Sequence, residues 1–133
     1  MSYSKFTSYK CGKFNFICRG WSTGRGWGHE AYLLIDGYGE VARYKTRYYN
    51  RTWEAYQYQS VMYGAVEDYY AKELAHFLRA KKIELGLIRW ENGEIEEPWR
   101  RGQKKQYIEE FEASDTGKDI KVMNRFIKER GEF

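Results

Sequence analysis

The feature that most constrains this chain is a long segment without proline. From Trp53 to Lys82 the apolar side chains recur at spacings near three and four residues, which places them along one side of an α-helix. Asn50 or Thr52 can cap the start of this helix, and a break is expected near residues 68–70. We expect the apolar stripe to cover a β-sheet. Its members are Tyr58, Val61, Met62, Ala65, Tyr69, Leu74, Phe77 and Leu78.

Strand-like alternation precedes the helix. Residues 13–19 and 41–48 alternate apolar and polar side chains, and residues 30–36 form a more apolar segment. The glycine-rich segment 20–28 is expected to be a loop, and residues 2–10 an edge strand. The sequence therefore predicts an α+β fold, with a three- or four-stranded antiparallel sheet packed against the long helix. Two sets of side chains are expected on opposite faces, Phe14, Phe16, Tyr44 and Tyr48 toward a core and Lys13, Arg19, Arg43, Lys45 and Arg47 outward.

The last third of the chain is expected to be an appendage. Residues 1–82 should form the sheet and long helix, and residues 83–133 a hairpin and helices that pack on this first part. Residues 83–90 suit either a strand or a continuation of the helix, and Asn92-Gly93 favours a hairpin turn. A helix is expected at residues 107–112, followed by a final amphipathic helix. The apolar side of that last helix carries Ile120, Met123, Phe126 and Ile127.

Charge is distributed unevenly, although the chain as a whole has a formal net charge of +4. Residues 1–52 hold nine Lys or Arg against three acids, a net of +6, while residues 53–133 hold fourteen against sixteen, a net of -2. An excess of cations at one end favours a polyanionic partner. The alternative is a solvated face that keeps the protein soluble. Aromatic residues make up 19% of the chain and supply the surface to be buried, despite a low mean hydropathy of -0.85.

Signals for catalysis are weak. The two histidines, His29 and His76, have no spacing typical of a metal site or of a nucleophile and base. Cys11 and Cys18 are expected to be reduced and structural. The glycine-rich segment lacks the lysine and hydroxyl residue that end a phosphate-binding loop. We therefore expect no catalytic residue, no metal and no cofactor.

Cations and tryptophans instead suggest a binding surface. The candidate residues are Arg19, Trp21, Arg25 and Trp27 in and beside the expected loop, and Arg43, Lys45 and Arg47 on the third strand. Cations neutralise phosphates, and exposed aromatic rings stack on unpaired bases. In the alternative interpretation, both tryptophans fold back to fill the open end of the core. The chain lacks a run of about 18 apolar residues and an apolar N-terminal signal, so we expect a cytoplasmic protein without membrane insertion.

Two resemblances add to this interpretation. A three-stranded sheet backed by one helix, over residues 13–80, resembles the arm-binding domains of integrases and plant ethylene-response-type domains, which implies duplex DNA as a partner. A second resemblance, to a different group of proteins, is based on three features. They are the motif Gly26-Trp27-Gly28-His29, a basic third strand, and the segment Asn50-Arg51-Thr52-Trp53-Glu54. The further residues that carry this second resemblance are Tyr56, Tyr58, Gln59, Ser60 and Val61.

These residues resemble small proteins encoded by phages and mobile elements of Gram-positive bacteria, among which are anti-CRISPR inhibitors. The resemblance implies a non-enzymatic protein that binds a Cas effector ribonucleoprotein or its guide RNA and blocks DNA binding or cleavage. The alternatives are a DNA-binding accessory or regulatory protein that uses its sheet, and a small hydrolase or nuclease if acids converge on His29. Residues 83–133 suit a homodimer or partner interface.

Overall fold

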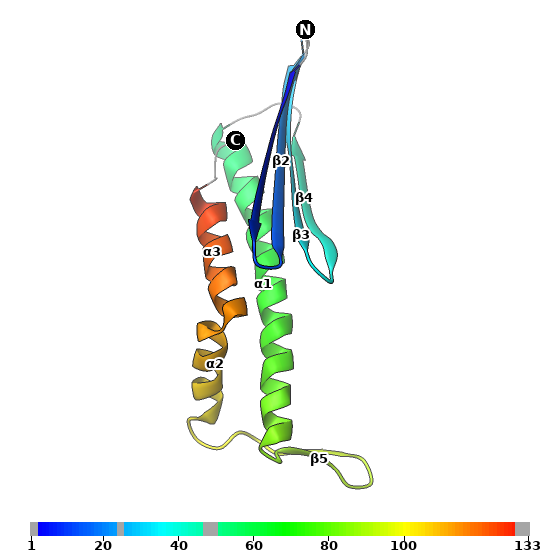
Figure 1. Cartoon of the computed structure of the whole chain (residues 1–133), viewed down its shortest axis with the longest axis vertical. Coiled ribbons are helices and arrows are strands. Elements are labelled where there is room, and N and C mark those ends of the chain that lie inside the picture. The colour runs from blue at the N-terminus through cyan, green and yellow to red at the C-terminus, as the bar shows by residue number, and fades with distance from the viewer. Residues whose placement is uncertain (1–2, 24–25, 47–50, 130–133) are drawn as a thin grey trace. The chain divides into compact units, whose positions relative to one another are not determined.

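The computed structural model describes the backbone of residues 3–23, 26–46 and 51–129, and the side chains of residues 8–19, 30–45 and 59–129. Four strands come first, then one long helix, a small hairpin and two further helices (Figure 1). The elements are β1 (Tyr3–Cys11), β2 (Phe14–Thr23), β3 (Gly26–Ile35), β4 (Gly39–Thr46), α1 (Arg51–Glu84), β5 (Ile88–Trp90), β6 (Glu94–Glu96), α2 (Gln103–Ala113) and α3 (Asp115–Glu129).

The first four strands form one antiparallel sheet in the order β1-β2-β3-β4. The α+β class and the edge strand β1 were predicted correctly. The expected loop over residues 20–28 was wrong, because β2 continues to Thr23 and β3 begins at Gly26. Register pairs Trp21 with Gly28, so glycine faces a large residue across the ladder rather than ending a strand.

One face of this sheet is buried, as the alternation predicted. Phe14 and Phe16 of β2 are each 1% exposed, and Leu33 of β3 is fully buried. On the same face, Tyr9 of β1 stacks on Phe126 of α3 with ring centroids 4.1 Å apart, and Phe16 meets Phe126 edge-on at 5.2 Å. The C-terminal helix therefore contributes an aromatic ring to the core of the sheet.

Helix α1 is one unbroken helix of 34 residues (Figure 1), so the break expected at residues 68–70 does not occur. Met62 and Val66 are fully buried, whereas Val61, expected in the apolar stripe, is 37% exposed. Because α1 begins at Arg51, Thr52 lies inside the helix, and the alternative cap, Asn50, falls outside the described residues. Tyr44 of the expected core is half-buried, and Tyr48 is likewise outside the described part.

The second half of α1 packs on α2. The ring of Phe111, a buried residue of α2, lies 5.8 Å from that of Tyr70 and 5.5 Å from that of Phe77. The Tyr70 hydroxyl also donates a hydrogen bond of 3.1 Å to Glu112. Part of the stripe expected to cover the sheet, including Phe77, thus packs against a C-terminal helix.

After α1 the chain forms the two-stranded hairpin of β5 and β6. Asn92 and Gly93 both have positive φ, +56° and +128°, as the predicted Asn-Gly turn requires. Lys82, near the end of α1, is 8% exposed and donates 2.9 Å hydrogen bonds to the Glu96 carboxylate and the Glu97 carbonyl. These two bonds attach the hairpin to the helix.

A tight junction links α2 to α3. The backbone N–H of Gly117 donates to the Ser114 hydroxyl at 3.3 Å, and the N–H of Lys118 donates to the Ser114 carbonyl at 2.9 Å. The Ser114 hydroxyl itself donates to the carbonyl of Phe111. Ser114 thereby ends one helix and caps the next. The apolar side of α3 is buried as predicted, at Ile120, Met123 and Ile127.

Contacts divide the chain into two compact units. Unit 1 comprises Met1–Glu67 and Asp119–Phe133, and unit 2 comprises Asp68–Lys118. Both α1 and α3 contribute residues to each unit. The division expected after residue 82 stays a prediction about domain organisation.

Candidate functional site

The residues that alternate with the core positions form the second face of the four-stranded sheet, here called the outer face. Successive side chains of a strand point to opposite faces, and register aligns Arg19, Glu30 and Lys45 in a row across β2, β3 and β4. The other described members are Ser8, Lys10, Asn15, Ile17, Tyr32, Leu34, Glu40 and Arg43. Among these described members, four Lys or Arg against two Glu give a formal charge of +2.

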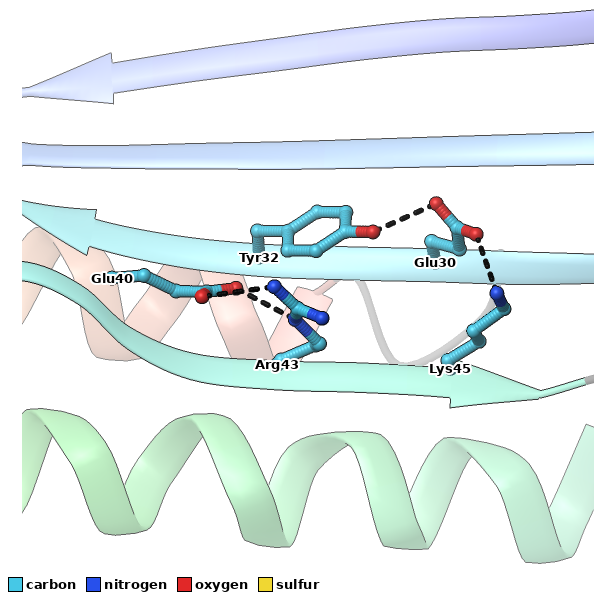
Figure 2. A network of polar contacts seen from close by, with 5 residues as sticks. All are labelled: Glu30, Tyr32, Glu40, Arg43 and Lys45. Carbon is cyan, nitrogen blue, oxygen red and sulfur yellow. Dashed lines mark hydrogen bonds and ion pairs between the residues drawn. The ribbon is translucent and has the colours of Figure 1, made fainter.

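Glu30 lies at the centre of the charged row. Its carboxylate accepts a 2.8 Å hydrogen bond from the Tyr32 hydroxyl and forms a 3.2 Å ion pair with Lys45 (Figure 2). The hydrogen bond from Tyr32 holds the pKa of Glu30 below its ordinary value, with Lys45 and the positive charge of Arg19 acting in the same direction. The same bond raises the pKa of Tyr32. At neutral pH the row therefore holds a carboxylate between two cations.

A second ion pair lies beside Tyr32. Arg43 binds Glu40 through two hydrogen bonds, from Nε at 2.9 Å and from Nη2 at 3.1 Å (Figure 2). The Arg43 guanidinium also lies over the Tyr32 ring, 5.2 Å from its centroid. The side chain of Arg43 remains 63% exposed. Since exposed ion pairs add little net stability, this cation can exchange its carboxylate for another anion at small cost.

The middle of the outer face is apolar. Ile17, Tyr32 and Leu34 occupy the two central strands and are half-buried. The charged groups described above lie around these three residues. An apolar centre with a charged border is the arrangement found in macromolecular interfaces.

The predicted binding residues are placed as follows. Arg19, Arg43 and Lys45 lie on the outer face and are exposed, as the alternation predicted. The structure also pairs Arg43 and Lys45 with carboxylates. Trp21 and Trp27 belong to β2 and β3 rather than to a loop, and their side chains are not among those described. Two further candidates fall outside the described residues, Arg25 and Arg47.

Sequence reasoning missed Glu30, Tyr32 and Glu40. Glu30 and Tyr32 are two residues apart in a strand and so share a face, which was a usable signal. The approach of Glu30 to Lys45 could not be predicted in this way, because it depends on the register between β3 and β4.

A shallow hollow of about 580 Å³ lies along α1 in unit 1, lined by Gln59, Ser60, Tyr63, Gly64 and Glu67. Burial raises the pKa of Tyr63, and the Gln59 amide donates to the carbonyl of Lys128 at 3.1 Å. The described lining has one carboxylate and no cation. An anionic ligand would therefore meet less favourable charge in this hollow than on the outer face.

Within the described ranges, no three His, Cys, Asp or Glu residues gather as a metal ion would require. Every helix in the described part of the chain is too short or too polar to span a lipid bilayer. Comparisons of the chain with protein-family models, curated proteins and solved structures found no match. What the outer face can bind is therefore inferred from its own chemistry.

Proposed function

We propose that this chain is a non-enzymatic binding protein that inhibits a Cas ribonucleoprotein in the cytoplasm of a bacterial host, with the outer face as its contact surface. The observation that carries the proposal is an apolar centre at Tyr32 bordered by Arg19, Arg43 and Lys45. The resemblance of the sequence to phage and mobile-element proteins directs it to CRISPR effectors.

The inhibition we propose is steric. A Cas effector carries guide RNA, a polyanion, and must admit a DNA target before cleavage. A face with a net charge of +2 is attracted to exposed RNA, and a bound protein of 16.0 kDa obstructs the path of the target. Imitation of DNA is a poor fit to the same face, because an imitation needs an excess of acids.

A cleavage assay tests the proposal. Purified protein is added to a panel of Cas ribonucleoproteins with matched DNA targets, and both binding and the cleavage rate are measured. The unaltered protein should bind at least one complex and slow its cleavage. Replacing Arg43 and Lys45 together by Gln removes two positive charges without introducing repulsion, and should weaken the inhibition.

The matched control replaces Lys104 and Lys105, two exposed lysines of α2, by Gln. This variant loses the same charge and should inhibit as strongly as the unaltered protein. Failure of the unaltered protein to bind or slow any complex refutes the proposed function. Loss of inhibition in the α2 variant alone moves the contact surface away from the outer face.

Binding of duplex DNA by the sheet is the second candidate function. Its supporting observation is that Arg43 and Lys45 lie two residues apart on the same face of β4. An electrophoretic mobility shift with duplex DNA should then appear, and should be lost in the double Gln variant. Absence of any shift with the unaltered protein ends this candidate.

A further inference from the structure

We propose that the outer face binds single-stranded RNA, with Tyr32 stacking on a base and Glu30 accepting a hydrogen bond from a ribose 2′-hydroxyl. The three cations that contact phosphates are Arg19, Arg43 and Lys45. This inference deepens the proposed function and rests on it, since it names RNA as the part of the ribonucleoprotein that the sheet contacts.

The position of Tyr32 is the first step. It lies on β3, one of the two central strands, with half-buried Ile17 and Leu34 beside it on the same face. A base needs an accessible aromatic ring with cations nearby, and bases in single strands offer their π-faces freely. In a duplex the bases are stacked on one another, so the ring would have no partner.

The hydrogen bond from Tyr32 to Glu30 holds the ring in place before any ligand arrives. The Tyr32 hydroxyl donates a hydrogen bond of 2.8 Å to Glu30 (Figure 2). The guanidinium of Arg43, a residue of β4, lies 5.2 Å from the centroid of the Tyr32 ring. A ring fixed in this way loses little conformational entropy on binding. The same arginine can contact a phosphate while it remains close to the ring.

Charge distinguishes RNA from a second copy of this chain as the occupant. Two outer faces, each with a formal charge of +2 over the residues that the structure describes, would repel one another. A nucleic acid strand instead satisfies Arg19, Arg43 and Lys45, of which the last two extend with 63% of their side chains exposed. The Glu40 partner of Arg43 is 37% exposed, so a phosphate can replace it without leaving a buried charge unpaired. The Glu30 partner of Lys45 is only 17% exposed, and it keeps its hydrogen bond from Tyr32 when a phosphate approaches Lys45.

Glu30 favours RNA over single-stranded DNA. An ionised carboxylate only accepts hydrogen bonds and repels phosphate, so its place between Arg19 and Lys45 is unfavourable for a ligand that offers phosphates alone. A ribose 2′-hydroxyl is a donor that DNA lacks. The row Arg19, Glu30 and Lys45 thus presents a cation, an acceptor and a second cation to the sugar-phosphate backbone.

Fluorescence anisotropy with a labelled single-stranded RNA of about 12 nucleotides, a length within the usual range of single-strand sites, tests the inference without any Cas protein. The unaltered protein should bind it, and the logarithm of its affinity should fall with that of the salt concentration with a slope of about -2, as three phosphate contacts give. Tyr32→Ala should weaken binding by about 5- to 150-fold, the contribution of one stacked base. Tyr32→Phe keeps the ring but loses the hydrogen bond to Glu30, so it should bind less tightly than the unaltered protein and clearly more tightly than Tyr32→Ala.

Two further variants complete the design. Trp90→Ala removes an aromatic side chain that is 59% exposed in the β5–β6 hairpin, and should leave RNA binding unchanged. Glu30→Ala should reduce the preference for RNA over DNA of the same sequence, even if the loss of a negative charge strengthens binding of both. Circular dichroism of each variant confirms that it folds.

Failure of the unaltered protein to bind RNA overturns the inference, as does equal binding by Tyr32→Ala and Tyr32→Phe. Tighter binding to single-stranded or duplex DNA than to RNA overturns it too. Inhibition of a Cas complex without RNA binding leaves the proposed function standing and refutes the RNA contact. RNA binding that depends on Tyr32, without inhibition of any Cas complex, supports the RNA contact and refutes the proposed function.

Discussion

Replacing Gly117 by alanine tests how closely α2 and α3 approach at their junction. A Cβ atom at this position would lie 2.5 Å from the carbonyl oxygens of both Phe111 and Glu112. These are backbone atoms at the end of a helix, so they cannot rotate away as a flexible side chain would. Overpacking of this kind costs up to about 3 kcal/mol, and alanine recovers at most about 1 kcal/mol through its higher helix propensity. We expect Gly117→Ala to lower the free energy of unfolding by about 2 kcal/mol.

Gly64→Ala is the matched control, because Gly64 is also helical but has no atom within 4 Å of the place that an added Cβ would occupy. Here only the propensity changes, and the variant should be more stable by about 0.5 to 1 kcal/mol. Urea denaturation followed by circular dichroism measures both variants under the same conditions. A Gly117→Ala protein as stable as the unaltered one would refute the close approach of α3 to the carbonyls of α2, and a destabilised Gly64→Ala would refute the open surroundings of Gly64.

Three further predictions concern single contacts. The pKa of Glu30 should rise toward its ordinary value in Tyr32→Phe, as measured by carbon-13 NMR of the carboxyl group. Folding lowers this pKa, so the ionised carboxylate stabilises the fold at pH values above its unfolded-state pKa. This contribution to stability is lost as the pH falls through the folded-state pKa. An unchanged titration would contradict the hydrogen bond. Burial and the nearby carboxylate of Asp119 raise the pKa of the Cys11 thiol, so Asp119→Asn should speed its alkylation by iodoacetamide, measured by mass spectrometry, and an equal rate would exclude this influence. Lys82→Met removes two 2.9 Å hydrogen bonds and should lower the free energy of unfolding by about 1 to 3 kcal/mol in urea titrations, whereas an unaltered midpoint would show that the hairpin is held by other contacts.

Strands and helices with a regular apolar period could be predicted from the sequence. Phe14 and Phe16 are buried as their alternation indicated, and the Asn92-Gly93 turn has the φ angles that this dipeptide favours. The glycine-rich segment could not be placed from local signals, since glycine is typical of loops. In the sheet, Gly28 pairs with Trp21, and the ladder of hydrogen bonds outweighs the low strand propensity of glycine.

The continuity of α1 has a similar cause. Tyr69 and Tyr70 have modest helix propensity, which favoured a break at this point. Tyr69 is only 4% exposed, and Tyr70 packs its ring on Phe111 and bonds to Glu112. Such packing stabilises a helix more than propensity does, and it involves residues far away in the sequence.

The candidate site was predictable in part. Period two alone placed Arg43 and Lys45 on the outer face. Their carboxylate partners depend on the offset between β3 and β4, which includes an irregularity between Leu33 and Leu34. One residue more or less in that offset would move Glu30 away from Lys45, so a list of cations gave no view of their pairing.

The discontinuity of unit 1 bears on the order in which the protein can acquire its structure during synthesis. Phe126, which packs on Tyr9 and Phe16, leaves the ribosome only after the whole of unit 2. At translation rates of about 5 to 20 residues per second, the interval occupied by Asp68–Lys118 lasts about 3 to 10 s. For that time the aromatic residues of the nascent sheet lack a ring that covers them in the finished protein, while all residues of unit 2 are made before the last segment of unit 1 emerges. A chaperone that binds exposed aromatic segments would therefore have access to the sheet before α3 packs on it.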